Sequence, residues 1–408
     1  MELEKVRSYA RLLAGMGVAT QKGDEVWVYG QAENHEFIRL VVEECYKLGA
    51  KKVRTLFYDD AVERLDYQYM TVRELSKVPS YRMAELKYRV KNLPSMLYID
   101  SEDPDSLKGI NVNKITKSSM AAGKKTKPLR DMMECKYKWC IGAIPSKAWA
   151  KKVFPDLPVE EAIEKLWDAI LMTSRAKEGD PLENWRNHNA NLLEHRHKLE
   201  SLDLQYLEYK ASNGTNFKVE LIKGINWGAG LELTDKGAAF NPNIPSEEVF
   251  TSPKAGSCDG ILYASKPLSY QGQLIEDFWV KFENGKVCAV GARKNQKLLE
   301  DMVHMDEGAS MLGEVALVPF ESPINESGIL FYNTLFDENA VCHVALGMGF
   351  KECLPGGQNM DNEKAHELGI NDSMIHVDFM IGTRDLEIVG TSFSGKKTVI
   401  FKNGTWAI

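Results

Sequence analysis

Hydrophobic positions in the first third of the chain switch repeatedly between two periods. Residues 24–30 (DEVWVYG) and 51–59 (KKVRTLFYD) have the apolar runs of buried strands, whereas residues 34–50 repeat apolar side chains at helical spacing and end near a glycine. Residues 95–101 and 137–144 are further short apolar runs. Strands that alternate with helices predict a mainly parallel sheet with crossover helices, so we expect an α/β domain at the N-terminus.

Two longer helical patterns follow at residues 159–172 and 184–200. The second is polar and carries His188, His195 and His197, which we interpret as surface histidines. No Gly-x-Gly-x-x-Gly motif follows the first strand, so no dinucleotide site is indicated. The basic stretch at 121–127 (AAGKKTK) lacks the glycine spacing of a phosphate loop, and we interpret it as a solvated turn.

After about residue 200 the pattern changes to short alternating segments separated by Gly, Asn and Ser. Segments such as FWVKFENGKVCAVGA are typical of antiparallel strands joined by hairpins. We therefore predict a second, β-rich α+β domain, with domains at residues 1–195 and 196–408. A chain of 408 residues has enough material for two hydrophobic cores.

Composition narrows the classes of function. The chain has 51 basic and 58 acidic residues, and its net charge of −7 gives no basic surface for nucleic acid. Seven scattered cysteines, none in a two-residue spacing, are typical of reduced thiols in a cytoplasmic protein. The charged N-terminal segment has no signal-peptide core, and no apolar run is long enough for a membrane span.

Ionisable side chains interrupt two strand-like segments of the second domain. Glu314 lies in the apolar run SMLGEVALVPF, where a lone carboxylate is costly to bury unless a cation or hydrogen-bond donor compensates it. In SMIHVDFMIG, strand alternation places His376 and Asp378 on the same face. A buried His–Asp hydrogen bond and a pair of metal ligands explain that placement equally well.

Two more segments carry acids in constrained sequence. NPNIPSEEVFTSP holds Glu247 and Glu248 between prolines, and DENAVCHVALGMGF contains Glu338 and His343. The last two residues are five apart, a spacing that shares no face of a helix or a strand. If both residues reach one site, the chain has to bend or change element between them.

The four segments together offer four carboxylates and two imidazoles. These are Glu248, Glu314, Glu338, His343, His376 and Asp378. Four negative charges would balance two divalent cations, and mixed oxygen and nitrogen ligands suit Zn²⁺, Co²⁺ or Mn²⁺. Two ions ~3.5–4 Å apart are an arrangement that serves hydrolysis. A dinuclear centre is therefore our hypothesis, provided that these residues converge in the fold.

These segments carry a resemblance as well. In the order and separation of NPNIPSEEVFTSP, GEVALVP, FDENAVCHVALG and IHVDFMIG, the chain resembles the thermophilic metallo-aminopeptidase family over essentially its whole length. The resemblance implies an α/β N-terminal domain, a β-rich catalytic domain, and a homodimer whose active sites face an enclosed cavity. It also implies that N-terminal residues are removed from short peptides by a dinuclear metal centre with a bridging hydroxide.

The resemblance assigns roles to individual residues. The family's metal ligands fall on Glu248, Glu314, Glu338, His343, His376 and Asp378. Glu248 is preferred over Glu247 because the second acid of the pair matches the family position. The resemblance makes Glu314 the bridging ligand, and Glu314 and Glu247 are both candidates for proton transfer in catalysis.

One residue departs from the family pattern. Seven residues after the histidine ligand, family members commonly carry a tyrosine close to the metal centre, and this chain has Phe350. A phenol can donate a hydrogen bond to a developing oxyanion, whereas a phenyl ring can only pack. A weakened, peptide-binding homologue is therefore one alternative function.

The other alternative belongs to a different reaction class. A related fold is a ring-cleaving dihydroxypyridine dioxygenase with one non-haem iron, and His343, His376 and Asp378 could form its two-His-one-carboxylate triad. A single iron would leave the three glutamates of the set crowded and uncompensated, so we favour the aminopeptidase.

Overall fold

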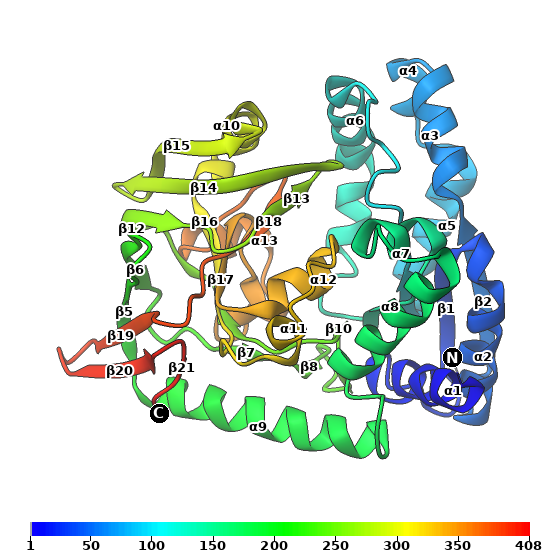
Figure 1. The fold of residues 1–408 in the computed structure, drawn as a ribbon, viewed down its shortest axis with the longest axis horizontal. Helices are drawn as coiled ribbons and strands as arrows, with labels where there is room; N and C mark the ends of the chain where they lie inside the picture. The colour runs from blue at the N-terminus through cyan, green and yellow to red at the C-terminus, as the bar shows by residue number, and fades with distance from the viewer. Residues whose placement is uncertain (1) are drawn as a thin grey trace. The chain divides into compact units, whose positions relative to one another are not determined.

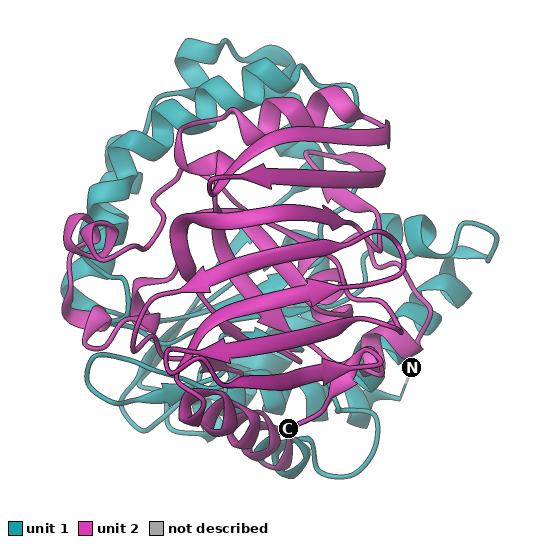
Figure 2. Cartoon of the chain, turned by 90° about the vertical axis from the view of Figure 1, so that its left-hand side faces the viewer, with its two compact units in different colours: residues 1–186, 231–245 teal, residues 187–230, 246–408 magenta. Residues whose placement is uncertain are grey.

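The computed structural model describes residues 2–408, which form two compact units (Figure 2). Unit 1 holds the chain up to Arg186 together with Leu231–Pro245. Unit 2 holds Asn187–Gly230 and Ser246–Ile408. Among the described residues, none of the helices combines the length and the apolarity that crossing a bilayer requires.

Unit 1 is built on a five-stranded parallel sheet, as the alternating pattern predicts (Figure 1). Its strand order is β10-β4-β3-β1-β2, and every pair is parallel. The strands are β1 (Glu25–Gln31), β2 (Lys52–Tyr58), β3 (Ser95–Asp100), β4 (Trp139–Ala143) and β10 (Asn243–Ile244). The central strands β1 and β3 are almost wholly buried, because crossover helices cover a parallel sheet.

The helices of unit 1 connect these strands. They are α1 (Leu3–Leu12), α2 (His35–Lys47), α3 (Asp60–Tyr69), α4 (Val72–Leu75), α5 (Ser80–Asn92), α6 (Val112–Asp131), α7 (Lys147–Val153) and α8 (Val159–Thr173), and α9 (Pro181–Ser201) begins in unit 1 and ends in unit 2. The predicted turn at 121–127 is wrong, since these residues lie inside α6. Asn111 caps that helix by accepting a hydrogen bond from the Lys114 backbone N–H.

The segment Leu231–Pro245 returns to unit 1 from within the sequence of unit 2. β10 pairs with β4, and the backbone N–H of Asn241 donates to the carbonyl of Gly17 at 2.9 Å. This pairing joins residues about a hundred positions apart, and no local pattern in the sequence marks it.

Unit 2 contains two antiparallel sheets. The larger has β5 (Leu204–Lys210), β6 (Asn216–Leu221), β12 (Pro253–Tyr263), β13 (Leu268–Tyr270), β14 (Gln273–Glu283), β15 (Lys286–Lys294), β19 (Glu387–Ser392), β20 (Lys397–Lys402) and β21 (Thr405–Trp406). Asn284 and Gly285 both have positive φ and join β14 to β15, as expected for an Asn-Gly hairpin.

The smaller sheet of unit 2 has five strands in the order β18-β17-β16-β11-β7. They are β7 (Gly228–Ala229), β11 (Val249–Thr251), β16 (Leu312–Leu317), β17 (His343–Gly347) and β18 (His376–Met380). Short helices flank the strands: α10 (Gln296–Val303), α11 (Pro323–Glu326), α12 (Thr334–Asp337) and α13 (Asn362–Glu367). Apolar side chains from both sheets form one core, so one face of the five-stranded sheet is packed and the other is left for polar groups.

Candidate metal centre

The register of three neighbouring strands brings two candidate carboxylates together. Glu314 on β16 and Asp378 on β18 both lie opposite Ala345 of the central strand β17. Directly paired residues of antiparallel strands project to the same face of a sheet, so both acids flank Ala345. The methyl side chain of Ala345 leaves space between them.

The two candidate histidines lie on the same face of this sheet. His343 begins β17, two residues before Ala345, and His376 begins β18, two residues before Asp378. His376 pairs with Gly347, which has no side chain to obstruct the imidazole. Strand periodicity therefore places both imidazoles beside the two acids, and His376 and Asp378 share a face as the pattern in SMIHVDFMIG predicts.

The remaining two acids come from segments next to this sheet. Glu248 directly precedes β11. Glu338 begins a single 3₁₀ turn, Glu338–Ala340, which ends before β17 starts at His343. The chain therefore changes element between Glu338 and His343, which explains a five-residue spacing that fits no single helix or strand.

Five of the six candidate ligands fall into two groups that share one residue. In the first group, one possible ligand atom from each of Glu248, Glu314 and His343 lies within 4.8 Å of the other two. In the second group, the same holds for Glu314, His376 and Asp378. Glu314 belongs to both groups, the position that a bridging carboxylate would hold. Glu338 is in neither group.

Short contacts link each imidazole to an acid. His343 Nε2 lies 3.2 Å from Glu248 Oε2, and His376 Nε2 lies 3.1 Å from Glu314 Oε2 and 3.4 Å from Asp378 Oδ1. The other ring nitrogens face backbone carbonyls: His376 Nδ1 is 2.7 Å from the oxygen of Met348. A carbonyl accepts the Nδ1 proton, and this leaves Nε2 free to act as a metal ligand.

The electrostatics of the cluster reflect crowded negative charge. Burial and the carboxylates of Asp378 and Glu248 raise the pKa of Glu314 to about 7, although His376 opposes the shift. Burial and the same two carboxylates raise the pKa of Glu338 well above its usual range. Without a cation, these acids therefore hold protons at pH values where an exposed glutamate has lost its own.

The histidines respond in the opposite sense. Burial alone would lower the pKa of His343, but the adjacent Glu248 and the carboxylate of Glu314 raise it to about 10. Acids thus stabilise a positive charge at this point of the fold. Imidazolium protons provide that charge in the isolated chain, and divalent cations could replace them.

The donor set fits divalent metal ions. Four carboxylates and two imidazoles are ligands that suit Zn²⁺, Co²⁺ or Mn²⁺. The set contains no thiolate, so it does not resemble the cysteine-rich site of a structural zinc. Asp378 Oδ1 is buried, and apart from the 3.4 Å contact with His376 Nε2 it has no hydrogen-bond partner among residues 2 to 408. A buried carboxylate oxygen without a donor is costly, and a metal ion would satisfy it.

Asn339 connects two of the candidate segments, and the sequence pattern did not single it out. This residue is fully buried. Its Oδ1 accepts a hydrogen bond from the Glu247 backbone N–H at 2.8 Å, and its Nδ2 donates to Glu338 Oε1 at 3.3 Å. Asn339 therefore fixes the acid pair 247–248 relative to Glu338.

His188 is buried, which contradicts the prediction of a surface histidine. Its Nε2 lies 2.7 Å from the carbonyl oxygen of Ser246 and 3.9 Å from Glu247 Oε2. Trp185 and Leu192 are also buried on α9, three residues before His188 and four after it. This helical spacing was the signal in the sequence that His188 faces inward.

Phe350 lies beside the candidate ligands. Its ring centroid is 4.9 Å from that of His376 and 5.4 Å from that of Phe250. The Oγ of buried Ser252 accepts a hydrogen bond from the Phe350 backbone N–H at 2.7 Å. The chain thus holds an aromatic ring without a hydroxyl directly against a candidate ligand.

Comparison with known proteins identifies the family. The family model described as thermophilic metalloprotease (M29) matches residues 2–406. The chain belongs to this family. It is 39% identical over 405 residues to aminopeptidase AmpS of Bacillus subtilis, covering 99% of this chain and 98% of that protein. Membership of the metalloprotease family makes the chain a metal-dependent peptide hydrolase.

Solved structures agree with the family and the fold. Wild-type AmpT from Thermus thermophilus matches with a TM-score of 0.91 and 33% identity over 99% of both chains. A 2,5-dihydroxypyridine dioxygenase from Pseudomonas putida matches with a TM-score of 0.50 and 11% identity, covering 99% of this chain and 96% of that one. The second likeness concerns the fold alone.

Proposed function

We propose that this member of the metalloprotease family is an aminopeptidase that releases N-terminal residues from short peptides at a dinuclear metal centre. The observation that carries the proposal is the position of Glu314 in two ligand groups that lie on one face of a sheet. The relatives AmpS and AmpT are aminopeptidases by name, which supports the same activity here.

The residues that would hold the two ions are the six predicted from the sequence. They are Glu248, Glu314, Glu338, His343, His376 and Asp378. Zinc, cobalt or manganese ions held there would supply Lewis acidity and would lower the pKa of a bound water. Glu314 would bridge the two sites, and Asn339 would keep Glu338 in place through the hydrogen bond to its carboxylate.

The chain's own groups then bind the substrate and move protons. The free α-amine of a peptide would be held by a metal ion or by nearby carboxylates, and this contact would fix cleavage at the first peptide bond. Glu314 is one candidate for accepting and returning a proton, because it belongs to both ligand groups. Glu247 is the alternative proton carrier, because it is buried next to Glu248.

Two finer proposals concern the setting of the enzyme. We propose a homodimer, because the family resemblance implies active sites that face an enclosed cavity. We propose a cytoplasmic location, because seven cysteines occur without a disulfide among the described residues. Light scattering would test the dimer directly, and a monomeric mass in solution would contradict it.

Metal stoichiometry is the test of the proposed site. Purified protein loaded with Zn²⁺ or Co²⁺ and passed through a desalting column should retain two ions per chain. His376→Ala should lower this number, whereas the matched variant His197→Ala, at an exposed histidine of α9, should retain both ions. One iron per chain would contradict the aminopeptidase and support the dioxygenase alternative.

A second candidate function is favoured by one observation, the position of Phe350 against His376. A chain that lacks the family's phenol could bind peptides and metal but turn them over slowly. Release of amino acids from leucine-led peptides at ordinary enzyme rates would exclude this weakened function.

A further inference from the structure

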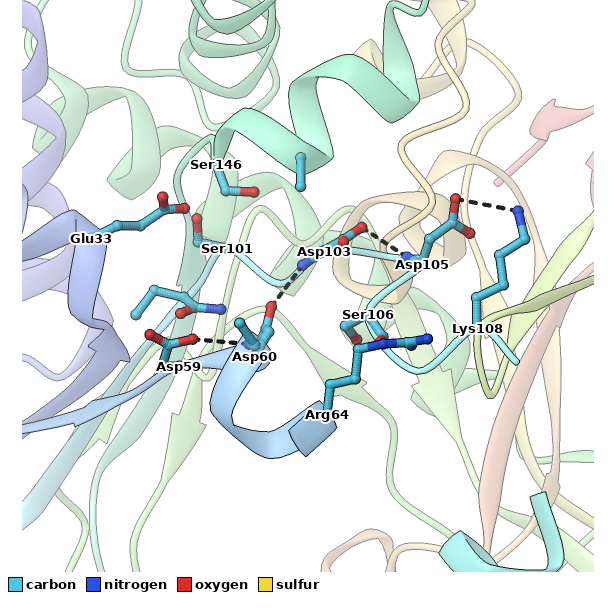
Figure 3. Close-up of a pocket in the computed structure, with 13 residues that line it drawn as sticks. Glu33, Asp59, Asp60, Arg64, Ser101, Asp103, Asp105, Ser106, Lys108 and Ser146 are labelled. Carbon is cyan, nitrogen blue, oxygen red and sulfur yellow. Dashed lines mark hydrogen bonds and ion pairs between the residues drawn. The ribbon is translucent and has the colours of Figure 1, made fainter. Parts of the chain in front are cut away.

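Unit 1 contains a cavity at the edge of its sheet where ligands bind in many open α/β folds. The cavity has a volume of about 510 Å³ and is lined by residues that follow β1, β2, β3 and β4 (Figure 3). The chain passes from β1 to β2 on one side and then to β3 on the other, so the strand order reverses between β1 and β3. A crevice at the carboxyl ends of strands beside such a reversal is a general binding position.

One side chain that lines this cavity, Gln31, is buried and has no side-chain hydrogen bond within the described part of the chain, and a second, Ser101, is also buried and has one hydrogen bond. Gln31 ends β1 and is 6% exposed, and its side-chain amide makes no hydrogen bond with any described residue. Ser101 follows β3 and is fully buried; its Oγ accepts a hydrogen bond from Asn34 Nδ2 at 2.7 Å. No acceptor for the Ser101 hydroxyl proton is found among residues 2–408. A buried amide without a partner reduces stability, so its presence beside a cavity indicates a polar ligand.

The charges of the lining indicate which ligand. Five carboxylates and two cationic side chains line the cavity, an excess of three negative charges. Burial raises the pKa of Asp60, and the negative charges of Asp103 and Asp100 raise it further. The hydrogen bond from the Asp103 backbone N–H acts in the opposite direction. Glu33 lies in the turn that leads into α2. A helix N-terminus can bind a phosphate, but the carboxylate of Glu33 would repel a phosphate at this one. The cavity therefore favours a cation and disfavours a nucleotide.

An inorganic ion does not fit this arrangement. Within the part of the chain that the structure describes, the groups of acids and histidines close enough to hold a metal ion all belong to unit 2. Among the described residues, no three acids of the cavity bring ligand atoms within 4.8 Å of one another, and the volume is in the range of small organic ligands. The cation is therefore an organic ammonium.

The cavity lining also has cationic side chains, Arg64 and Lys108. Figure 3 draws Glu33 and Asp59 on one side of the view, Arg64 near the middle, and Lys108 on the other side beside Asp105. Lys108 and Lys152 both pair with Asp105, at 3.8 Å and 2.9 Å, so Arg64 is the cationic side chain that is left for a ligand. Arg64 donates through Nη1 to the carbonyl of Ser106 at 2.6 Å, and this bond holds the guanidinium in place while other N–H groups remain for a ligand. The acids Glu33 and Asp59 on one side and the Arg64 guanidinium toward the middle match a molecule that carries an ammonium and a carboxylate (Figure 3).

From this cavity we infer that unit 1 has a binding site for a polar zwitterion, a free amino acid, separate from the proposed catalytic function. The ammonium contacts the acids near Asp60 and Glu33, the carboxylate contacts Arg64, and the Gln31 amide and Ser101 hydroxyl donate to the ligand. Apolar side chains contribute only the methyl groups of alanines to the lining, so polar or cationic amino acids fit best.

Calorimetry on the full-length, metal-loaded protein tests this inference with L-lysine as the probe. We expect saturable binding of L-lysine and none of Nα,Nε-diacetyl-lysine, whose ammonium groups are blocked. Gln31→Leu, which removes the amide at similar volume, and Asp60→Asn should each weaken binding at least tenfold. Asp66→Asn, at an exposed acid of the same helix α3, is the matched control and should bind as the parent does.

Three outcomes overturn the inference and leave the aminopeptidase proposal intact. L-lysine binding that is lost in His376→Ala and unchanged in Gln31→Leu and Asp60→Asn would place the ligand at the metal centre. Equal binding of the diacetylated compound would exclude recognition of the ammonium. The absence of saturable heat from a protein whose thermal unfolding is normal would exclude the site.

Discussion

At the scale of single residues, the site combines groups whose ionisation is interdependent. Glu314 and His376 are 3.1 Å apart, and each changes the pKa of the other. The types of these residues could be predicted from the sequence, because a carboxylate within an apolar strand and a histidine two residues before an aspartate are visible there. Asn339 could not be assigned in that way, since asparagines on polar stretches are usually solvated, whereas the helical spacing of His188 from Trp185 and Leu192 could have indicated its burial.

Replacement of Phe350 tests the departure from the family pattern. Phe350→Tyr would place a hydroxyl beside His376, and a donor to the oxyanion lowers the barrier by ~3 kcal/mol, about 100-fold in rate. We expect kcat for a leucine-led peptide to rise toward that limit with KM little changed. Phe350→Leu, which adds no hydroxyl, serves as the control. If Phe350→Tyr leaves kcat unchanged, the missing phenol has no cost.

The raised pKa of Asp337, which is not one of the proposed metal ligands, predicts that the stability of the protein depends on pH. Burial raises its pKa to about 7, although the Phe331 and Asn333 backbone N–H groups donate to its carboxyl. The unfolded chain releases this proton near pH 4, so the folded state binds more protons between about pH 4 and 7. Stability from Asp337 is therefore complete below pH 4 and is lost as the pH rises through 7.

The loss associated with Asp337 is on the order of 4 kcal/mol, since three pKa units separate the two states. In Asp337→Asn, this component of the pH dependence should disappear. The thermal unfolding midpoints of the parent and of Asp337→Asn at pH 5 and pH 8 measure this component. The midpoint of the parent minus that of the variant should be larger at pH 5 than at pH 8. A constant difference at both values would contradict the shifted pKa.

At the scale of elements, a β-bulge in β16 decides which way Glu314 points. Leu312 pairs with Leu346, yet Glu314 pairs with Ala345, so one extra residue is inserted at Gly313. In a regular strand Leu312 and Glu314 would share a face, but here Leu312 enters the core and Glu314 enters the site. The sequence predicted a buried strand with an acid in it and gave no sign of the bulge, because the bulge depends on the partner strand.

Gly313→Ala should disturb this bulge. A Cβ at position 313 would lie 2.1 Å from the Met348 carbonyl oxygen and 2.4 Å from that of Gly347, both backbone atoms. We expect the variant to lose about 1–3 kcal/mol of stability, because the added methyl group overpacks this site. We also expect it to bind fewer ions, because Glu314 would move. Gly123→Ala is the control: that position in α6 has open space, and the variant should gain up to ~1 kcal/mol. Full metal content in Gly313→Ala would contradict this role of the bulge.

At the scale of the whole molecule, the two units differ in how much of their fold could be predicted from the sequence. In unit 1, apolar runs of strand length between helical repeats were enough to predict the parallel sheet, because each unit of strand and helix is local. The exceptions were residues 121–127, whose glycine and lysines look like a turn, and Leu231–Pro245, which joins the sheet from far along the chain. In unit 2 the strands were predictable, but the register that gathers their acids was not.

Metal removal should affect the two units differently. The proposed ligands all belong to unit 2, so bound ions should stabilise β16, β17 and β18 by mass action and leave β1 and β3 unaffected. Hydrogen exchange followed by mass spectrometry should therefore show faster exchange in peptides from β16–β18 after chelation, with little change in β1 and β3. Equal acceleration in both units would contradict a site confined to unit 2.

The most direct test of the central claim is the fate of a peptide with a free N-terminus. Mass spectrometry should show the zinc- or cobalt-loaded protein removing residues one at a time from the amino end of a leucine-led pentapeptide. The same peptide acetylated at Nα should remain intact, because it has no free amine for the metal ions or nearby carboxylates to hold. Cleavage of the acetylated peptide, or cleavage at internal bonds first, would contradict an aminopeptidase built on Glu314 and its neighbouring ligands.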